Sequence, residues 1–281
     1  MQLDRTRIAV RERDYADLLD LSLIVSRGHA WALFRLWFFG VIPVFIFQWV
    51  LCFIVLDIDA EWSFYTFEEY MGEDFLLDYG AFWVGTSILL TPLALAPMTI
   101  YLGQATFSED PSVTQAFKSF VPCIFQLFVL QTMFRILLMV ACCLPVLFLM
   151  MGFPHINEII LLERNSWGGT LTRIQKFHGQ NFGLVFLRSI EEGIIFFVFL
   201  LPAGWFSLLM VRNLFFNQWE WLDPGLTLGL YFELPILLWV VTGFFTVVRF
   251  LGYLDLRIRS EGWEIELQMR AEAQRLEQRF V

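Results

Sequence analysis

The sequence predicts an all-α, polytopic membrane protein with six transmembrane helices, cytoplasmic interfacial helices, and both termini in the cytoplasm. Of the 281 residues, 58% are hydrophobic and 18% aromatic, whereas a soluble domain is about 45–50% apolar. Apolar runs recur at the length of about 20 residues that crosses a hydrocarbon core. Finally, no Lys or Arg lies between Arg35 and Lys118, although that stretch contains ten Asp and Glu residues.

Six segments have the length and apolarity of membrane spans. They are residues 33–56, 79–102, 121–140, 143–162, 193–216 and 225–248. The third and fourth form one nearly unbroken run, which as a single helix would be about 63 Å long, twice the thickness of the core. We therefore expect this run to fold back near Ala141-Cys142. A re-entrant pair of helices is the alternative.

The distribution of basic residues predicts the orientation, because cytoplasmic loops are enriched in Lys and Arg. Sixteen of the 19 basic residues fall in four segments that we assign to the cytoplasm: 1–30, 103–120, 163–192 and 249–281. The segments assigned to the outside, 57–78 and 217–224, contain acidic residues and no Lys or Arg. A net charge of -9 without a basic stripe argues against a nucleic-acid partner.

The chain divides into three parts. Residues 1–30 form a cytoplasmic segment with an interfacial helix, 31–254 the membrane domain, and 255–281 a cytoplasmic tail. Three short amphipathic segments each lead into an odd-numbered span and form a weak internal repeat. These segments are Leu18–His29, Val113–Val121 and Thr170–His178. The alternative is that any such span simply needs a basic, interfacial lead-in.

Charged residues within the spans are the candidate functional residues, because charge is costly inside a bilayer. Arg135, Arg212 and Glu233 all lie in the predicted outer half of their spans, where they can meet. They form either a substrate- or proton-binding cluster or a static ion pair between helices. At the cytoplasmic mouth of the fifth span, Arg188 is expected to pair with Glu191 and Glu192 at helical spacing.

The tail has the pattern of a docking helix. Its apolar residues follow a helical period among Glu, Arg and Gln, which favours a surface that binds a partner, self-associates or lies on the membrane. The residues that form this stripe are Ile265, Met269, Leu276 and Phe280.

Catalytic and metal-binding motifs are missing from the sequence. It contains no P-loop, nucleophile elbow or HExxH motif, and its three His and four Cys have no zinc spacing. We therefore expect no enzyme activity, no cofactor and no metal. The cysteines are predicted to be apolar filler, or alternatively Cys52 forms a disulfide with Cys142 or Cys143.

Three segments together resemble a broad bacterial family of six-helix proteins. They are PSVTQAFKSF, ILLERNSWGGTLTRIQKFHGQNFG and YLDLRIRSEGWEIEL. The family is related to the membrane domain of multi-pass glycerophosphodiester phosphodiesterases and to YciC-like inner-membrane proteins. The resemblance implies a location in the bacterial inner membrane and, since some members are encoded beside MoxR-type AAA ATPases, a partner of that kind. It implies no phosphodiesterase activity, which belongs to a separate barrel domain.

Two functions are consistent with these features. We expect a non-catalytic membrane subunit that acts as an anchor or scaffold, with a protein partner on the cytoplasmic side or self-association. The alternative is a transporter or lipid-handling protein that works through the Arg135, Arg212 and Glu233 cluster.

Overall fold

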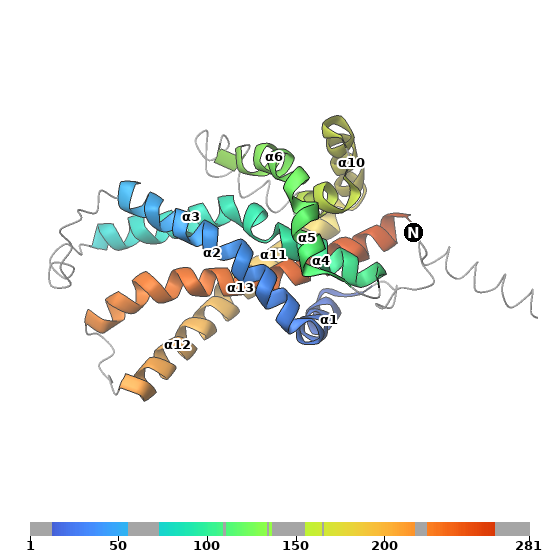
Figure 1. Cartoon of the computed structure of the whole chain (residues 1–281). Helices are drawn as coiled ribbons and strands as arrows, with labels where there is room; N and C mark the ends of the chain where they lie inside the picture. Colours follow the sequence, from blue (N-terminus) through green and yellow to red (C-terminus); the bar gives the residue numbers. More distant parts are fainter. Residues whose placement is uncertain are drawn as a thin grey trace, which may run out of the picture.

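The computed structural model describes residues 13–55, 73–108, 111–133, 135–136, 155–164, 166–216 and 224–261. Helices account for 94% of this described part, which contains no strand (Figure 1). The elements are α1 (Tyr15–Gly28), α2 (Ala30–Val55), α3 (Glu73–Ala94), α4 (Ala96–Phe107), α5 (Val113–Phe120), η2 (Val121–Cys123), α6 (Ile124–Leu127), η3 (Phe128–Met133), α9 (Ile156–Glu158), η4 (Ile159–Glu163), α10 (Trp167–Gln180), α11 (Phe182–Ile194), η5 (Ile195–Leu200), α12 (Leu201–Phe216) and α13 (Pro224–Glu261).

Several of these helices identify a multi-pass membrane protein. Four helical runs are long and apolar enough to cross a bilayer: Ala30–Val55, Val113–Met133, Phe182–Val211 and Glu233–Ser260. A bent pair, Tyr79–Ala94 with Ala96–Thr106, makes up to five. The described residues thus contain four or five candidate spans rather than the predicted six. Most of the predicted span 143–162, with the expected fold-back near 141–142, lies outside them.

The second predicted span, 79–102, is a broken helix. Its two halves, α3 and α4, meet at Leu95 with a bend of 41°. Pro92 lies just before the break and Pro97 just after it, and neither can donate a backbone hydrogen bond to continue the helix. Gly40 of α2 lies against the Ala94 carbonyl at this point. Helix α2 can therefore approach the bend closely only because residue 40 has no side chain.

The third span begins earlier than predicted. Helix α5 continues without a break through the 3-10 turn η2 and helix α6 into the π-helical segment η3. The candidate span is therefore Val113–Met133, not one that starts at residue 121. Pro122 does not interrupt the run, because it occupies the start of a 3-10 turn, where a missing donor is tolerated.

The last span also differs from the prediction, which ended it at residue 248 and began a cytoplasmic tail at residue 255. Helix α13 continues to Glu261, and Asp255, Leu256 and Ile258 are buried in the bundle. Charged residues suggested an end to the span, but Asp255 is neutralised by Arg188 and therefore lies inside the packed structure. The predicted boundary between 254 and 255 falls within one helix.

The spans form an inner and an outer set. The Glu233–Ser260 run has 67% of its apolar window buried, whereas Ala30–Val55 and Val113–Met133 have 17% and Phe182–Val211 has 6%. Helix α4 and segment η4 are also mostly buried and contact each other, and α4 contacts α13. The outer helices expose large apolar side chains such as Phe39, Ile54 and Phe199, as expected for a surface that faces lipid.

The three predicted lead-in segments are all helices. They correspond to α1, α5 and α10. Helix α1 packs on α13, whereas α5 packs on α4 and α10 on η4, the elements that directly precede them in the chain. Because two of these contacts join neighbours in the sequence, the internal repeat stays a prediction.

Different helix ends gather at the two ends of the bundle. Figure 1 shows the end of α2, the starts of α3 and α13, and the end of α12 at one end, on the left of the view. Helices α1, α5 and α10 lie toward the other end. The ends grouped on the left are those that border the two predicted acidic outer segments.

A buried polar network joins the helices in the half of the bundle nearest the acidic segments. Gln48 of α2 donates to the hydroxyl of Thr86 at 2.9 Å and accepts a 2.8 Å hydrogen bond from the Trp239 indole. Trp37 in turn donates to the Trp239 carbonyl at 2.9 Å. Because water is absent from the bilayer core, such groups must satisfy one another. The network fixes α2, α3 and α13 in register.

Candidate functional site

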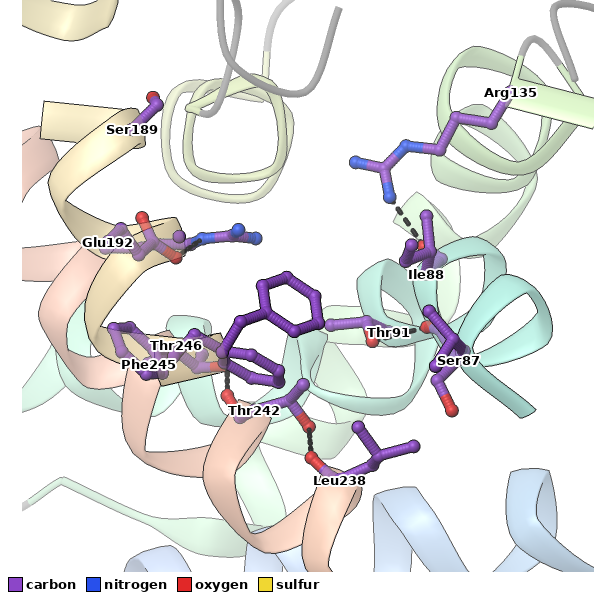
Figure 2. Close-up of a pocket in the computed structure, with 15 residues that line it drawn as sticks. Ser87, Ile88, Thr91, Arg135, Ser189, Glu192, Leu238, Thr242, Phe245 and Thr246 are labelled. Carbon is purple, nitrogen blue, oxygen red and sulfur yellow. Dashed lines mark hydrogen bonds and ion pairs between the residues drawn. The ribbon is translucent and has the colours of Figure 1, made fainter. Parts of the chain in front are cut away.

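A cavity of about 180 Å³ lies between α3, α11, η5 and α13, with the side chain of Arg135 at one side of it (Figure 2). Segment η5 is π-helical, as is η3, which directly precedes the Arg135 region. Such segments are frequent at functional sites. The lining residues are Val84, Ser87, Ile88, Thr91, Arg135, Ser189, Glu192, Gly193, Phe196, Phe197, Leu238, Thr242, Phe245, Thr246 and Arg249.

Much of the wall is apolar despite its hydroxyl-bearing residues. The hydroxyls of Thr91, Ser189, Thr242 and Thr246 each donate to the backbone carbonyl four residues earlier in their own helix. These donors are therefore already satisfied within their helices. Phenylalanine and leucine side chains supply most of the remaining surface. The groups with strong polar capacity are the charged ones.

Arg249 and Glu192 form an ion pair at the cavity wall. The guanidinium Nε of Arg249 lies 2.6 Å from Oε1 of Glu192, which joins α13 to α11. Of their side-chain surfaces, 26% and 14% remain accessible, because both residues face the cavity. The pair is therefore within reach of a ligand.

Arg135 faces the cavity from the other side. In Figure 2 its guanidinium lies across the cavity from Glu192, beside Ile88. Only 7% of the residue is exposed, and one nitrogen donates a 2.7 Å hydrogen bond to the Ile88 carbonyl. Its Nε has no hydrogen-bond partner, and no carboxylate in the described part of the chain lies within ion-pair distance. Arg135 is thus a buried cation that holds only a neutral acceptor.

A second buried acid, Glu158, lies behind the lining. It is 2% exposed, and Nδ1 of His155 lies 4.0 Å from its carboxylate. Arg135 and Arg249 both act on it electrostatically, without a direct ion pair to either. Its carboxylate therefore makes no ion pair with Arg135, which donates to the Ile88 carbonyl instead.

Of the three residues of the predicted charge cluster, Arg135, Arg212 and Glu233, only Arg135 is among the described residues that line this cavity. Arg135 lies near Arg249 and Glu158, and its guanidinium makes no contact with Glu233. Glu233 is partly buried near the other end of α13. Residue 212 lies in α12, but its side chain is outside the described residues.

Two further predictions concern regions that the structure describes in part. Cys52 is a buried free thiol packed beside Tyr79 and Trp83, while its two predicted disulfide partners are outside the described residues. The apolar stripe of the tail is also outside them: Ile265, Met269, Leu276 and Phe280.

The expected pairing of Arg188 with Glu191 and Glu192 is wrong. Arg188 instead bonds to Asp255 of α13, with 2.8 Å between Nη2 and Oδ2, and Glu192 bonds to Arg249. These partners are far away in the sequence. Helix neighbours gain little from pairing on a surface, whereas packing of α11 against α13 offers each charge an opposite charge at short range.

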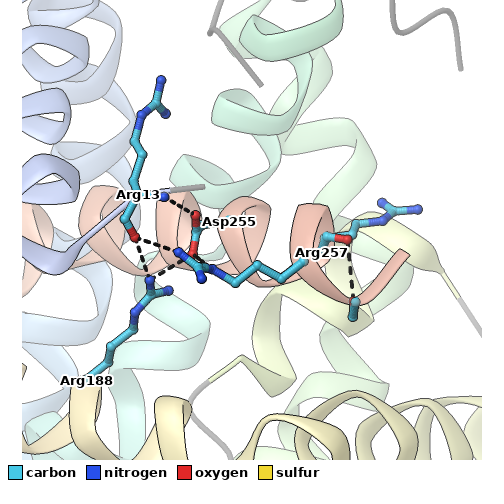
Figure 3. Close-up of polar contacts among 6 residues, drawn as sticks. Arg13, Arg188, Asp255 and Arg257 are labelled. Carbon is cyan, nitrogen blue, oxygen red and sulfur yellow. Dashed lines mark hydrogen bonds and ion pairs between the residues drawn. The ribbon is translucent and has the colours of Figure 1, made fainter. Parts of the chain in front are cut away.

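The Asp255 carboxylate also anchors the start of α1 (Figure 3). The backbone N–H of Arg13 donates to Asp255 at 2.8 Å, and the Arg13 carbonyl accepts from Arg188 at 2.9 Å and from Arg259 at 3.0 Å. Arg259 closes the cluster with a 2.9 Å bond to Asp255. The backbone of Arg13 is therefore held through both its donor and its acceptor.

The sequence did not predict this cavity. It also did not indicate that Glu192 and Arg249 line one site together. Both lie next to span ends in the sequence, where charges are ordinarily solvated. No local pattern indicated that they meet. The available signal was that Arg249 interrupts an apolar stretch that continues to Leu254.

Comparison with known proteins provides no assignment: no family model, curated protein or solved structure matches this chain. Within the described ranges, no three His, Cys, Asp or Glu side chains gather as potential metal ligands. The chemistry of the cavity itself is therefore the basis for a functional assignment.

Proposed function

We propose that this chain is a transporter or lipid-handling membrane protein that binds an anionic small molecule in the cavity beside Arg135. The observation that carries the proposal is the buried guanidinium of Arg135, which faces a cavity and has no carboxylate within ion-pair distance among the described residues. An uncompensated buried charge costs several kcal/mol. A bound anion offsets this cost directly.

Arg249 gives the anion a second cationic partner. Arg135 and Arg249 line the cavity together with Glu192, which supplies one carboxylate among the described lining residues. An anion between the two guanidiniums would compete with Glu192 for Arg249 and provide Arg135 with a charged acceptor. Arginine is suited to this role, because its planar donors bind carboxylates and phosphates in a bidentate manner.

The lining favours binding over catalysis. Among the lining residues that the structure describes there is no His, Cys or Lys, and four of the hydroxyls are held by helix backbone. General acid–base catalysis needs a titratable group within reach of the substrate. The carboxylate of Glu192, the one such group among the described lining residues, is already engaged by Arg249. We accordingly retain the proposal that the protein is not an enzyme.

The test uses hexanoate, a small carboxylate with a short apolar chain, and the neutral alcohol hexanol. We expect hexanoate to bind the purified protein and to raise its unfolding temperature, and hexanol to do so more weakly. Replacing Arg135 with Gln should reduce hexanoate affinity by about tenfold to hundredfold, the loss of a charged hydrogen bond. Arg27→Gln removes an exposed arginine of α1 and is the matched control.

Equal binding of hexanoate to wild-type protein and the Arg135→Gln variant would contradict the proposal. Equal binding of hexanoate and hexanol would contradict it as well, because the cavity would then recognise only the apolar chain. An unchanged gel-filtration profile in detergent verifies that the Arg135→Gln variant is folded.

A second proposal, an anchor or scaffold for a cytoplasmic partner, is favoured by the grouping of α1, α5 and α10 toward one end of the bundle. The partner kind implied by the family resemblance is an AAA ATPase system. Because α13 is packed as far as Ile258, a fair test truncates the chain after Glu261 rather than before Asp255. Unchanged recovery of co-purifying partners would count against the tail as the docking element.

Orientation and location are part of the proposal. We propose that both termini are cytoplasmic, that the membrane is the bacterial inner membrane, and that the chain belongs to the resembling six-helix family. A single cysteine introduced at Thr66 should then react with an impermeant thiol reagent in intact cells, whereas one at Gln175 should not. Labelling of both positions, or of Gln175 alone, would reverse or remove this orientation.

A further inference from the structure

We propose that the ligand of the Arg135 cavity is a single-chain amphiphile, with an anionic headgroup held by the arginines and an apolar chain that leaves the bundle past Phe197. This inference rests on the proposed anion binding and adds the class of ligand. It follows from the size of the cavity, the character of its walls and its place next to the outermost helix.

The size of the cavity excludes a large enclosed ligand. Its volume of about 180 Å³ is below the range of about 300–1,000 Å³ of pockets that enclose whole drug-sized ligands. A carboxylate or phosphate with the first few carbons of a chain fits inside. A diacyl lipid does not, because two chains would have to enter the same narrow space.

The walls provide separate places for a head and a chain. The charges lie on opposite sides of the cavity, as Arg135 and Glu192 do in Figure 2. The aromatic rings of Phe196, Phe197 and Phe245, with Leu238, line the rest. A small soluble anion would leave these apolar surfaces uncovered, whereas each buried methylene of a chain adds about 0.8 kcal/mol in small-molecule transfer data.

An exit toward lipid is present at Phe197. This residue lines the cavity and is also 54% exposed on the outside of the bundle. It belongs to the Phe182–Val211 run, which is only 6% buried and is thus the most peripheral of the candidate spans. The rim of the cavity therefore reaches the surface that we expect to face acyl chains, and a ligand can enter laterally without crossing water.

Gly193 gives a direct way to block the chain. It lines the cavity on α11, and a side chain added there would meet no other atom within 4 Å. Gly193→Leu should therefore place an apolar side chain in the cavity from a position with open space around its Cβ atom. Gly183→Leu lies on the same helix, also without a neighbour within 4 Å, and is the matched control. Ser189→Leu, one turn before Gly193, provides a second blocking variant.

The experiment measures how much radiolabelled palmitate, hexadecyl phosphate or hexadecanol the protein retains in lipid nanodiscs. Empty nanodiscs give the background, and hexanoate is the short anion for comparison. We expect palmitate or hexadecyl phosphate to bind at least about tenfold more tightly than hexanoate, and hexadecanol to bind at least tenfold more weakly than the better of the two. The tighter of the two long-chain anions identifies the headgroup as a carboxylate or a phosphate monoester. Gly193→Leu and Ser189→Leu should lose at least tenfold in long-chain affinity, and Gly183→Leu should not.

The outcomes separate this inference from the proposed function. If hexanoate binds through Arg135 but the long-chain anions bind no more tightly, the amphiphile is wrong and anion binding stands. Long-chain binding that is unchanged in both blocking variants likewise overturns the inference, because the chain then lies elsewhere. If neither short nor long anions bind in an Arg135-dependent way, both proposals fail.

Discussion

The guanidinium of Arg188 lies 2.8 Å from the carboxylate of Asp255, and this ion pair connects α11 to the C-terminal half of α13. Asp255 is 2% exposed and also accepts from Arg259 and from the backbone of Arg13. Removal of its charge leaves two arginines without their shared anion. We predict that Asp255→Asn lowers the free energy of unfolding by about 3–5 kcal/mol, measured by titration with SDS in mixed micelles.

Asp20→Asn is the control for that experiment, since it makes the same chemical change at an exposed position of α1. We expect it to alter stability by less than about 0.5 kcal/mol. A similar, small effect of both substitutions would show that Asp255 does not hold the three elements together.

Gln48 and Trp239 form the central bond of the polar network, and we predict that they are energetically coupled. Gln48→Leu leaves the buried Trp239 indole without an acceptor and should destabilise the protein by about 1 kcal/mol. Trp239→Phe removes that donor, so the double variant should be more stable than the sum of the single effects indicates. Additive effects in this double-mutant cycle would argue against the bond. Gln175→Leu, at an exposed site of α10, is the control.

Gly40 is predicted to be intolerant of a side chain. A methyl group there would meet the carbonyl of Ala94, which is backbone and cannot rotate away. We expect Gly40→Ala to lower stability by about 1–3 kcal/mol, as overpacking does. Gly80→Ala, in α3 with no neighbour within 4 Å, should be neutral or slightly stabilising. Equal thermal stability of the two variants would contradict the close approach of α2 to the bend.

Tyr15 provides a prediction about pH. Burial, together with the nearby carboxylates of Glu192 and Glu191, raises the pKa of the Tyr15 phenol above its ordinary value. Above about pH 10 the unfolded chain loses this proton before the folded protein does, so stability falls as the pH rises. Tyr15→Phe removes the effect. Its unfolding temperature relative to wild type should therefore increase between about pH 9 and about pH 11; a constant difference would contradict the burial.

Local patterns in the sequence were sufficient to predict the helices. The lead-in segment Val113–Val121 is α5, Val113–Phe120, because an apolar stripe and a basic end mark it without reference to the rest of the chain. The predicted span 33–56 coincides closely with the candidate span Ala30–Val55 for the same reason, whereas 193–216 only overlaps Phe182–Val211, which begins eleven residues earlier. Their apolar runs are long enough to cross the hydrocarbon core of a bilayer.

Long-range partners were not predictable from those patterns. Arg188 was assigned to acids on its own helix, whereas its partner is on α13, and Arg249 was assigned to a solvated loop although it pairs with Glu192. A charged residue marks the end of a membrane span only when its side chain remains in contact with water. Where two helices bring opposite charges together, the same residues lie inside the bundle, and only the packing of α11 against α13 determines this.

The stability of the Arg135→Gln variant without ligand tests the central claim most directly. If Arg135 is retained to bind an anion, it is a liability in the empty protein, and replacing it with a neutral amide should raise the unfolding temperature of protein stripped of amphiphiles. Arg27→Gln should leave that temperature unchanged. A lower unfolding temperature for Arg135→Gln would instead make Arg135 a structural residue and contradict the anion-binding account.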